Sequence, residues 1–304
     1  MKTRAIALLM AIVGALVLSA CQTMEGATDV ALEVGKAGNL LTDVQVESIR
    51  KGAGALSRSF EGFTPEQEYY LGRSVSAVIL SKYKPFVDER TNRYVNTLGQ
   101  ALSQVSDLPE VFNGYHFLVL DSEDINAFAA PGGLIFVTRG LLRCCKTEDA
   151  AAAVLAHEIG HAQLRHGLQA IKAARITDAL TIIALEGAKT FGSKDLARLT
   201  ETFEGSISDI ASTLINSGYS RTLEFEADRA AVTILKRLGY DPNGLLDMLG
   251  VMRQNLKPGS PDFARTHPAP EDRIAEIGKF HGGFPRAKYP PERQDRFQVA
   301  LRRI

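Results

Sequence analysis

The sequence predicts an α+β fold that is mainly helical, with a small sheet or hairpin next to a helix that carries the motif HExxH. Two observations predict this arrangement. Strand-like apolar runs are confined to residues 117–138, whereas apolar residues recur at helical spacing near residues 64–105 and through most of residues 147–279. No internal repeat is visible, so we do not expect a helical-repeat architecture.

The composition of the 304 residues is that of an ordinary globular protein. Hydrophobic residues make up 45% of the chain and charged residues 23%, which argues against intrinsic disorder. The 35 Lys and Arg residues balance the 35 Asp and Glu residues. Because the charges are balanced and dispersed, we expect no nucleic-acid partner.

The first residues indicate an export signal. Lys2 and Arg4 precede an uninterrupted apolar run over residues 5–18. This run is short for a membrane span and has the length of a signal-peptide core. We therefore expect residues 1–20 to be a signal peptide.

A cysteine closes this apolar run. The segment Leu18-Ser19-Ala20-Cys21 resembles the lipobox of bacterial lipoproteins, in which the cysteine is acylated and becomes the new N-terminus. In such lipoproteins an Asp after the cysteine favours the inner membrane, and Gln22 stands at that place. The resemblance therefore implies a lipid anchor at Cys21 in the outer membrane, facing the periplasm. The alternative is an ordinary cleavable signal with a cysteine nearby.

Three parts are expected after the signal peptide. Residues 21–60 are rich in Gly, Ala, Thr and Ser and are expected to be a lipidated N-terminus and tether. Residues 61–280 are expected to form one domain, and residues 281–304 a C-terminal extension. The apolar stretch at residues 176–188 contains two acidic residues, which favours a packed or interfacial helix over a membrane helix.

Two helices are expected at the start of the domain. The segment Thr64-Pro65-Glu66-Gln67 combines an N-cap residue, a proline at the first helical position and an acidic first turn. A second helix is expected over about residues 88–105, where Tyr94, Leu98 and Leu102 share one face.

The pattern then changes from helical to strand-like. Short apolar runs occupy residues 117–120 and 134–138, and the turn-forming segment Pro131-Gly132-Gly133 precedes the second run. We expect a hairpin or a small sheet here.

Two adjacent cysteines, Cys144 and Cys145, follow the second run. A disulfide between neighbouring residues would close a strained ring with poor geometry. A redox role is the alternative, but we expect free thiols packed as small hydrophobic side chains.

The strongest chemical signal is His157-Glu158-Ile159-Gly160-His161, which follows an alanine-rich, helix-favouring run. On a helix, His157 and His161 project from one face one turn apart, so both can reach a single Zn²⁺. Glu158 is rotated by about 100° and can take a proton from a water beside the metal. For an isolated match, the alternative is a chance histidine pair on an exposed helix.

A third ligand is needed to make this motif a catalytic metal site. The metzincin pattern requires Gly and His at positions that hold Leu164 and Gly167, so that class is excluded. His166 lies five residues after His161, about 140° round the helix. We expect it to be a surface or helix-end histidine rather than a ligand.

A later acidic segment offers the missing carboxylate. Glu224 and Asp228 are four residues apart and share one helix face, whereas Glu226 points elsewhere. One of the pair can bind zinc while the other accepts the N–H of a ligating histidine. Two histidines and one carboxylate, with an open fourth position, are the ligands of a catalytic zinc site, and we expect one Zn²⁺ per chain.

These segments resemble family forty-eight of the zinc metallopeptidases, gluzincins that include HtpX, the CAAX prenyl proteases and BepA-like periplasmic proteases. The stretch from Asn126 to Gly133, running on through residues 138–142, is similar to the family's NAF-PGG segment. The segment Thr266-His267-Pro268-Ala269-Pro270 with Arg273 is similar to its HP-P motif.

The resemblance implies a zincin-type metallopeptidase domain over residues 61–280. The expected elements include neither the membrane helices of HtpX nor the tetratricopeptide repeats of BepA. The similarity is therefore closest to the small periplasmic lipoprotein members.

The resemblance also implies roles for single residues. His157, His161 and Glu224 would hold zinc, Asp228 would orient a ligating histidine, and Glu158 would be the general base. The resemblance places His267 at the mouth of the site. It would then stabilise the oxyanion, plug the fourth zinc position, or remain a loop histidine without metal contact.

The hairpin has a functional and a structural interpretation. An edge strand beside the zinc helix would bind an unfolded substrate by strand addition through its backbone. Alternatively, residues 131–133 simply form a turn. The expected substrate-binding residues are Asn126, Ala127, Phe128, Gly132 and Gly133.

The expected function is that of a zinc-dependent endopeptidase that cleaves misfolded or misassembled cell-envelope proteins, a substrate class implied by the resemblance. Its partners would be these substrates and the membrane, reached through the lipid at Cys21. The alternative is a chaperone-like or scaffold lipoprotein with a latent zinc site.

Overall fold

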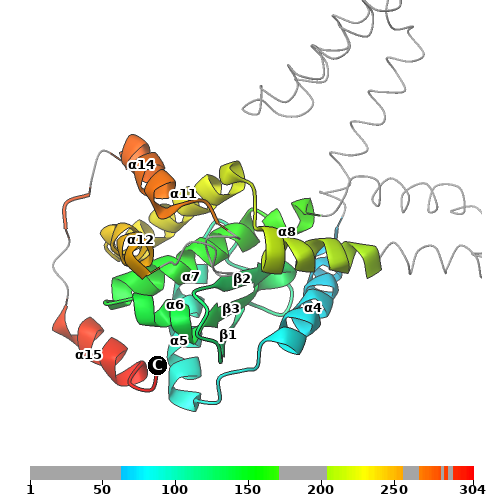
Figure 1. Cartoon of the computed structure of the whole chain (residues 1–304), viewed down its shortest axis with the longest axis horizontal. Coiled ribbons are helices and arrows are strands. Elements are labelled where there is room, and N and C mark those ends of the chain that lie inside the picture. The colour runs from blue at the N-terminus through cyan, green and yellow to red at the C-terminus, as the bar shows by residue number, and fades with distance from the viewer. Residues whose placement is uncertain (1–62, 171–203, 256–266, 282–283, 287–289) are drawn as a thin grey trace, which may run out of the picture. The chain divides into compact units, whose positions relative to one another are not determined.

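The computed structural model describes residues 63–170, 204–255, 267–281, 284–286 and 290–304. From Thr64 on, these residues belong to one compact unit. They are mainly helical and contain one three-stranded sheet (Figure 1), which confirms the predicted fold class. Among the described helices, none is long and apolar enough to cross a membrane. The expected signal peptide, the tether and the helix at residues 176–188 lie outside the described residues.

Both helices expected at the start of the domain are present. α4 (Pro65–Lys82) begins with a capping box, in which the Gln67 N–H donates to Thr64 Oγ1 at 3.2 Å and the Thr64 N–H donates to Gln67 Oε1 at 3.0 Å. α5 (Glu89–Ser103) buries one apolar face in the core. The periodicity and capping signals therefore predicted both elements correctly.

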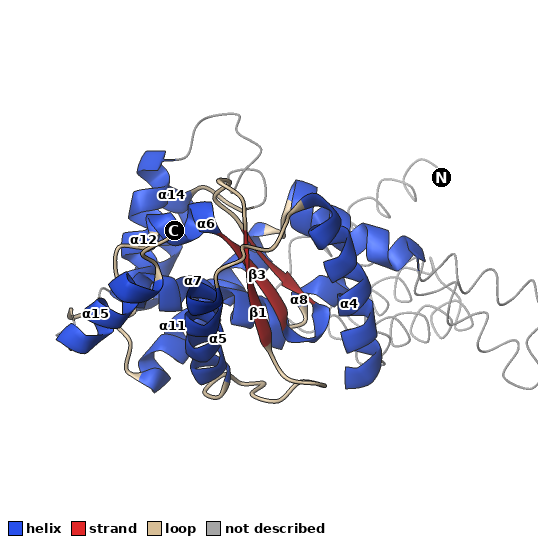
Figure 2. Ribbon diagram, turned by 90° about the horizontal axis from the view of Figure 1, so that it is seen from below, coloured by secondary structure: helices blue, strands red, loops and turns tan. Residues whose placement is uncertain are grey.

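The sheet has the strand order β1-β3-β2. β1 (His116–Leu120) pairs in parallel with β3 (Leu134–Thr138), and β2 (Ala127–Ala130) pairs antiparallel with β3 through the turn at η1 (Pro131–Gly133). The two predicted apolar runs, residues 117–120 and 134–138, therefore pair in parallel, so the small sheet is confirmed but these runs do not form a hairpin with each other. The hairpin expected over residues 126–138 is β2 with β3. Figure 2 shows the strands between α4 on one side and α5 with α7 on the other.

The two edges of the sheet differ. Side chains of α5 cover the β1 edge, because the Phe117 N–H donates to Asn96 Oδ1 at 3.1 Å and the Val119 N–H donates to Asn92 Oδ1 at 3.0 Å. β2 forms the other edge and packs beside α7. All four residues of β2 are buried and η2 (Thr213–Ser217) packs against this strand, so a further strand could join the β2 edge only after η2 moves away.

The central helix of the unit is α7 (Glu148–Gln163), and its alanine-rich stretch is buried on all sides. α11 (Arg221–Leu238) packs along it. At the crossing, a Cβ on Gly160 would lie only 2.9 Å from the Ala227 carbonyl oxygen. The missing side chain at this position therefore allows the two helices to approach closely.

The C-terminal residues pack onto the start of α7. The Glu148 carboxylate accepts hydrogen bonds from Tyr94 Oη at 3.0 Å, Tyr240 Oη at 2.8 Å and Arg296 Nε at 2.6 Å. Arg296 belongs to α15 (Pro291–Ala300), so the expected C-terminal extension is joined to the helix that carries HExxH. The remaining described elements are α6 (Arg139–Cys144), α8 (His166–Gln169), a helix over residues 204–212, η2 (Thr213–Ser217), α12 (Asn243–Asn255) and α14 (Pro270–His281).

The two adjacent cysteines are free and buried, which confirms the prediction of packed thiols. Burial raises the pKa of both thiols. Since the thiolate is the reactive form, this environment makes them poor nucleophiles.

Candidate metal centre

The structure brings the HExxH histidines and a distant carboxylate together. The Nε2 atoms of His157 and His161 lie 3.1 Å apart on the same face of α7. Glu224, in the first turn of α11, places Oε2 at 3.5 Å from His157 Nε2 and Oε1 at 3.4 Å from His161 Nε2. All three side chains are buried.

These atoms fit a tetrahedral metal ion. Ligand atoms bound to one Zn²⁺ at about 2.1 Å are about 3.4 Å apart, close to the three distances here. Glu224 Oε1 is also buried without a hydrogen-bond partner among the described residues. A buried carboxylate oxygen without a donor is costly, and a bound cation would remove that cost.

His267 joins the same cluster. Its Nδ1 lies 2.7 Å from Glu224 Oε2, and ligand atoms of His157, Glu224 and His267 all lie within 4.8 Å of one another. Burial raises the pKa of Glu224, but His267, His157 and His161 outweigh it and hold this pKa well below its usual range. The carboxylate is therefore ionised and available as a ligand.

A buried ion pair orients His157 from behind. Asp228 Oδ1 lies 3.0 Å from His157 Nδ1, and Arg273 of α14 donates to Asp228 through Nε at 2.9 Å and Nη2 at 2.5 Å. Burial raises the pKa of Asp228, but Arg273 and His157 bring it to about 2. The ionised Asp228 accepts the Nδ1–H of His157 and leaves Nε2 free to face the metal position.

His161 is oriented by a second histidine. The Nδ1 atoms of His161 and His166 lie 2.8 Å apart, and His166 Nε2 lies 3.3 Å from a Glu226 carboxylate oxygen. His166 is expected to be a surface or helix-end histidine: it lies at a helix end, as the first residue of α8, but the surface position is wrong because it is fully buried. α7 ends at Gln163 and Arg165 adopts a left-handed conformation with φ of 54°. The chain therefore turns back, and an angle extrapolated along one helix does not apply.

A tyrosine covers the other side of His161. The Tyr219 ring stacks on the imidazole with a centroid distance of 4.4 Å and an interplanar angle of 21°. Tyr219 directly precedes the N-cap residue of α11, and no spacing rule in the sequence signals this contact. Its packing restricts the orientation of the His161 ring.

Glu158 faces a small cavity next to the cluster. His161, His267 and Tyr219 also line this cavity, whose volume of about 10 Å³ is roughly that needed for one water molecule. Burial raises the pKa of Glu158 to about 7. Of the expected substrate-binding residues, Ala127 and Phe128 line the cavity, whereas Asn126, Gly132 and Gly133 are not among its described lining residues.

Comparison with known proteins identifies the family. The model of peptidase family M48 matches residues 89–280, which include every residue of the cluster. The chain belongs to family M48. The family predicted from the motifs is therefore confirmed, and metallopeptidases of this family are in general zinc-dependent.

M48 relatives with established names align with much of the chain. The β-barrel assembly-enhancing protease of Escherichia coli is 31% identical over 195 residues, which cover 62% of this chain and 38% of that protein. The mitochondrial metalloendopeptidase OMA1 of Schizosaccharomyces pombe is 30% identical over 228 residues, 71% of this chain and 58% of that protein. The metalloprotease LoiP of Escherichia coli is 26% identical over 279 residues, 91% of this chain and 96% of that protein. The chain thus spans less than two thirds of the first two relatives and nearly all of LoiP.

Proposed function

We propose that the protein is a zinc-dependent endopeptidase. The observation that carries the proposal is the meeting of His157, His161 and Glu224 at ligand distances, with Glu158 beside them. His157 Nε2, His161 Nε2 and the Glu224 carboxylate would hold one Zn²⁺ per chain. A structural zinc site normally closes with four ligands, whereas three ligands and an adjacent carboxylate are typical of a catalytic site.

Glu158 is the proposed general base. Bound zinc supplies a Lewis acid and lowers the pKa of a coordinated water toward about 7. The Glu158 carboxylate takes a proton from the attacking water and returns it to the leaving amine. A neighbouring cation favours the ionised form, so the pKa of about 7 that burial gives this carboxyl would fall when the metal binds.

We infer that His267 is a plug that keeps the site latent. Its position next to Glu224 supports this role over that of an oxyanion donor, because it reaches the ligand cluster without substrate. A plug predicts that His267→Ala raises cleavage of an unfolded protein. A donor predicts that the same change lowers cleavage, and an unchanged rate would contradict both roles.

Substrate is proposed to bind by strand addition at β2. Ala127 and Phe128 line the cavity from this edge strand, and Leu214 and Tyr219 line it from the segment before α11. A peptide is far larger than the present cavity, so the segment from Leu214 to Tyr219 has to move before a substrate enters. Because backbone hydrogen bonds are independent of side chains, this mode suits unfolded chains of varied sequence.

Gly132 and Gly133 are proposed to support the β2 edge through the shape of the turn, without contacting the substrate. Gly132 has φ of 73°, and a Cβ there would lie 2.7 Å from Tyr69 Cα. Gly133 has φ of 79°, and a Cβ there would lie 2.9 Å from Tyr115. Both positions therefore shape the turn that ends β2, and we expect substitutions to disturb the hairpin rather than a substrate contact.

Misfolded or misassembled envelope proteins are the proposed substrates. The name of the Escherichia coli β-barrel assembly-enhancing protease supports this choice.

The competing proposal, a chaperone-like lipoprotein with an idle zinc site, makes a different prediction. Glu158→Gln should abolish chelator-sensitive cleavage of an unfolded protein while zinc content stays near one equivalent. A wild-type protein that never cleaves would favour the chaperone.

A lipid anchor at Cys21 in the outer membrane, facing the periplasm, is part of the same proposal. Metabolic labelling with a fatty acid tests it directly. Label should enter the wild-type protein and be absent from Cys21→Ser. Label in both proteins, or in neither, would contradict the anchor.

A further inference from the structure

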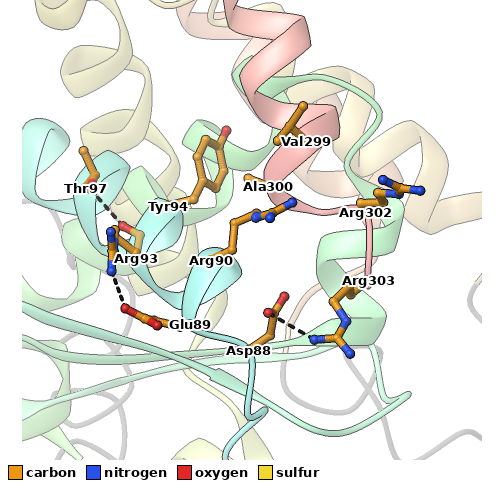
Figure 3. A pocket seen from close by; sticks show the side chains of 10 residues that line it. All are labelled: Asp88, Glu89, Arg90, Arg93, Tyr94, Thr97, Val299, Ala300, Arg302 and Arg303. Carbon is orange, nitrogen blue, oxygen red and sulfur yellow. Dashed lines mark hydrogen bonds and ion pairs between the residues drawn. The ribbon is translucent and has the colours of Figure 1, made fainter.

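A second pocket shares no lining residue with the metal centre. It lies between the first turns of α5 and the end of α15 and has a volume of about 820 Å³ (Figure 3). This volume is within the range of small-molecule sites. Nothing in the proposed peptidase mechanism uses it.

Positive charge predominates in this pocket. Arg90 and Arg93 come from α5, and Arg302 and Arg303 from the turn that follows α15. Two carboxylates, Asp88 and Glu89, also line it, which leaves a net charge of +2. Figure 3 shows Arg90 and Arg93 on one side and Arg302 and Arg303 on the other, with Arg90 extending toward Val299 and Ala300.

The arginines are not neutralised within the described part of the protein. Arg93 pairs with Glu89, and Arg303 Nη1 lies 3.6 Å from Asp88 Oδ1. The Arg93–Glu89 pair is exposed on both sides and therefore weak, and in the longer Arg303–Asp88 pair the arginine side chain is 74% exposed, so both arginines can turn toward a ligand. Arg90 and Arg302 have no acidic partner among the described residues.

This chemistry selects a phosphate group. The planar guanidinium group presents a fork of N–H donors that matches phosphate oxygens, and several arginines around one hollow can bind one or two phosphates at once. A ligand of this kind would supply the negative charge that the pocket lacks.

Exposed aliphatic side chains flank the arginines and identify the source of the phosphate. Val299 lines the pocket with 56% of its surface exposed. Val87 lies just outside the lining, directly before Asp88 in the chain, and is 93% exposed. Cationic side chains beside exposed aliphatic ones are typical of surfaces that rest on anionic bilayers. A soluble phosphate compound would give these valines no apolar environment.

We propose that this pocket is a membrane-docking site, in which the arginines bind phosphates of anionic lipid head groups and the two valines enter the bilayer interface. The site is distinct from the proposed lipid anchor. An anchor on a tether limits only the distance of the domain from the membrane, whereas a docked pocket fixes its orientation.

The test uses the full chain reconstituted into vesicles of phosphatidylcholine with or without phosphatidylglycerol. An arginine-specific reagent such as phenylglyoxal is applied, and the rate at each arginine is measured by mass spectrometry. Each arginine near an anionic surface contributes attraction equivalent to about five-fold in binding. We therefore expect phosphatidylglycerol to slow modification of Arg90 and Arg302 by about five-fold or more, and high salt to reverse this. Arg73 and Arg253, surface arginines outside the pocket, are internal controls.

Two double variants test whether the protection depends on the pocket or only on the overall charge of the protein. Arg90→Gln with Arg302→Gln should remove the protection of Arg303 by phosphatidylglycerol. Arg73→Gln with Arg253→Gln carries the same charge change and should leave it intact. Circular dichroism and unchanged cleavage of an unfolded protein show that both double variants are folded.

Three outcomes would overturn the proposal. The first is equal protection of pocket and control arginines, which would indicate general attraction. The second is no protection by phosphatidylglycerol. The third is that inorganic phosphate, added to phosphatidylcholine vesicles, protects the pocket as well as phosphatidylglycerol does, which would assign the site to a soluble phosphate compound.

Discussion

Gly160→Ala tests whether the close approach of α7 and α11 sets the metal geometry. A Cβ at this position would lie 2.9 Å from the Ala227 carbonyl oxygen, and ordinary contact begins at 3.4 Å. The helices would have to separate by about 0.5 Å to restore that contact. Ala227 lies between Glu224 and Asp228 in the sequence, so the displacement acts directly on the metal cluster.

The expected magnitudes follow from this displacement. Metal–ligand distances tolerate only about 0.2 Å, so a shift of about 0.5 Å should lower zinc affinity by about ten-fold or more. Overpacking costs about 1–3 kcal/mol of unfolding free energy, while replacing a helical glycine with alanine returns about 1 kcal/mol. The net loss should therefore reach up to about 2 kcal/mol.

Gly250→Ala is the matched control, because Gly250 lies inside α12 and a Cβ there would meet nothing within 4 Å. This variant gains the same helix propensity as Gly160→Ala, but its new Cβ makes no close contact. Zinc affinity is measured by competition with a chromogenic chelator and stability by urea unfolding. The two variants should differ by about 1–3 kcal/mol. Equal stability and equal zinc affinity in the two variants would refute the reasoning.

The remaining predictions concern the residues around the metal ligands and the metal itself. Arg273→Met leaves the Asp228 carboxylate buried without its guanidinium partner, and should cost about 3–5 kcal/mol in urea unfolding; Arg229→Met, in an exposed ion pair, should cost less than about 1 kcal/mol. His166→Phe should lower zinc affinity by about 10–100-fold, whereas His116→Phe, an exposed histidine, should leave it unchanged in the same chelator competition. Free zinc at about 100 times its Kd should stabilise the protein by about 2.7 kcal/mol over the chelated form, and equal unfolding midpoints in the two samples would contradict a metal site in the folded state.

The sequence predicts the local parts of this protein well. The capping box at Thr64, the alanine-rich helix and the apolar runs of β1 and β3 each depend on neighbours within a few residues, so periodicity and propensity are sufficient to find them. The i and i+4 spacings of His157 with His161 and of Glu224 with Asp228 are local too, and both pairs lie as the spacing requires.

The residues that surround the candidate metal ligands cannot be predicted in this way. His166 reaches His161 through a left-handed residue that breaks the helix, Tyr219 stacks from a separate segment, and Arg273 comes from a helix 45 residues after Asp228. These contacts depend on where helices pack, and no periodicity encodes that. The one usable signal was the position of Arg273 three residues after Pro270, within the HP-P segment.

The buried charges explain why Glu158 and the metal depend on each other. Glu224 and Asp228 are ionised, and Arg273 compensates only one of them. With His157 neutral, as a metal ligand has to be, an ionised Glu158 would bring the centre to a net charge of −2, which a divalent cation neutralises. Without the cation, burial and the charge of Glu224 raise the pKa of Glu158 from 4.5 to about 7.

This raised pKa predicts a pH dependence for the chelated protein. The folded state holds the Glu158 proton between about pH 4.5 and 7, where the unfolded state has lost it, so stability falls as pH rises through this window. A difference of about 2.5 pKa units corresponds to roughly 3 kcal/mol, fully lost above pH 7. In urea unfolding with chelator, the stability of the wild type relative to Glu158→Gln should fall by this amount as pH rises through the window. Burial lowers the pKa values of His161 and His166, which act in the opposite direction but are common to both proteins. Parallel curves for the two proteins would show that Glu158 is not the buried carboxyl that the metal keeps ionised.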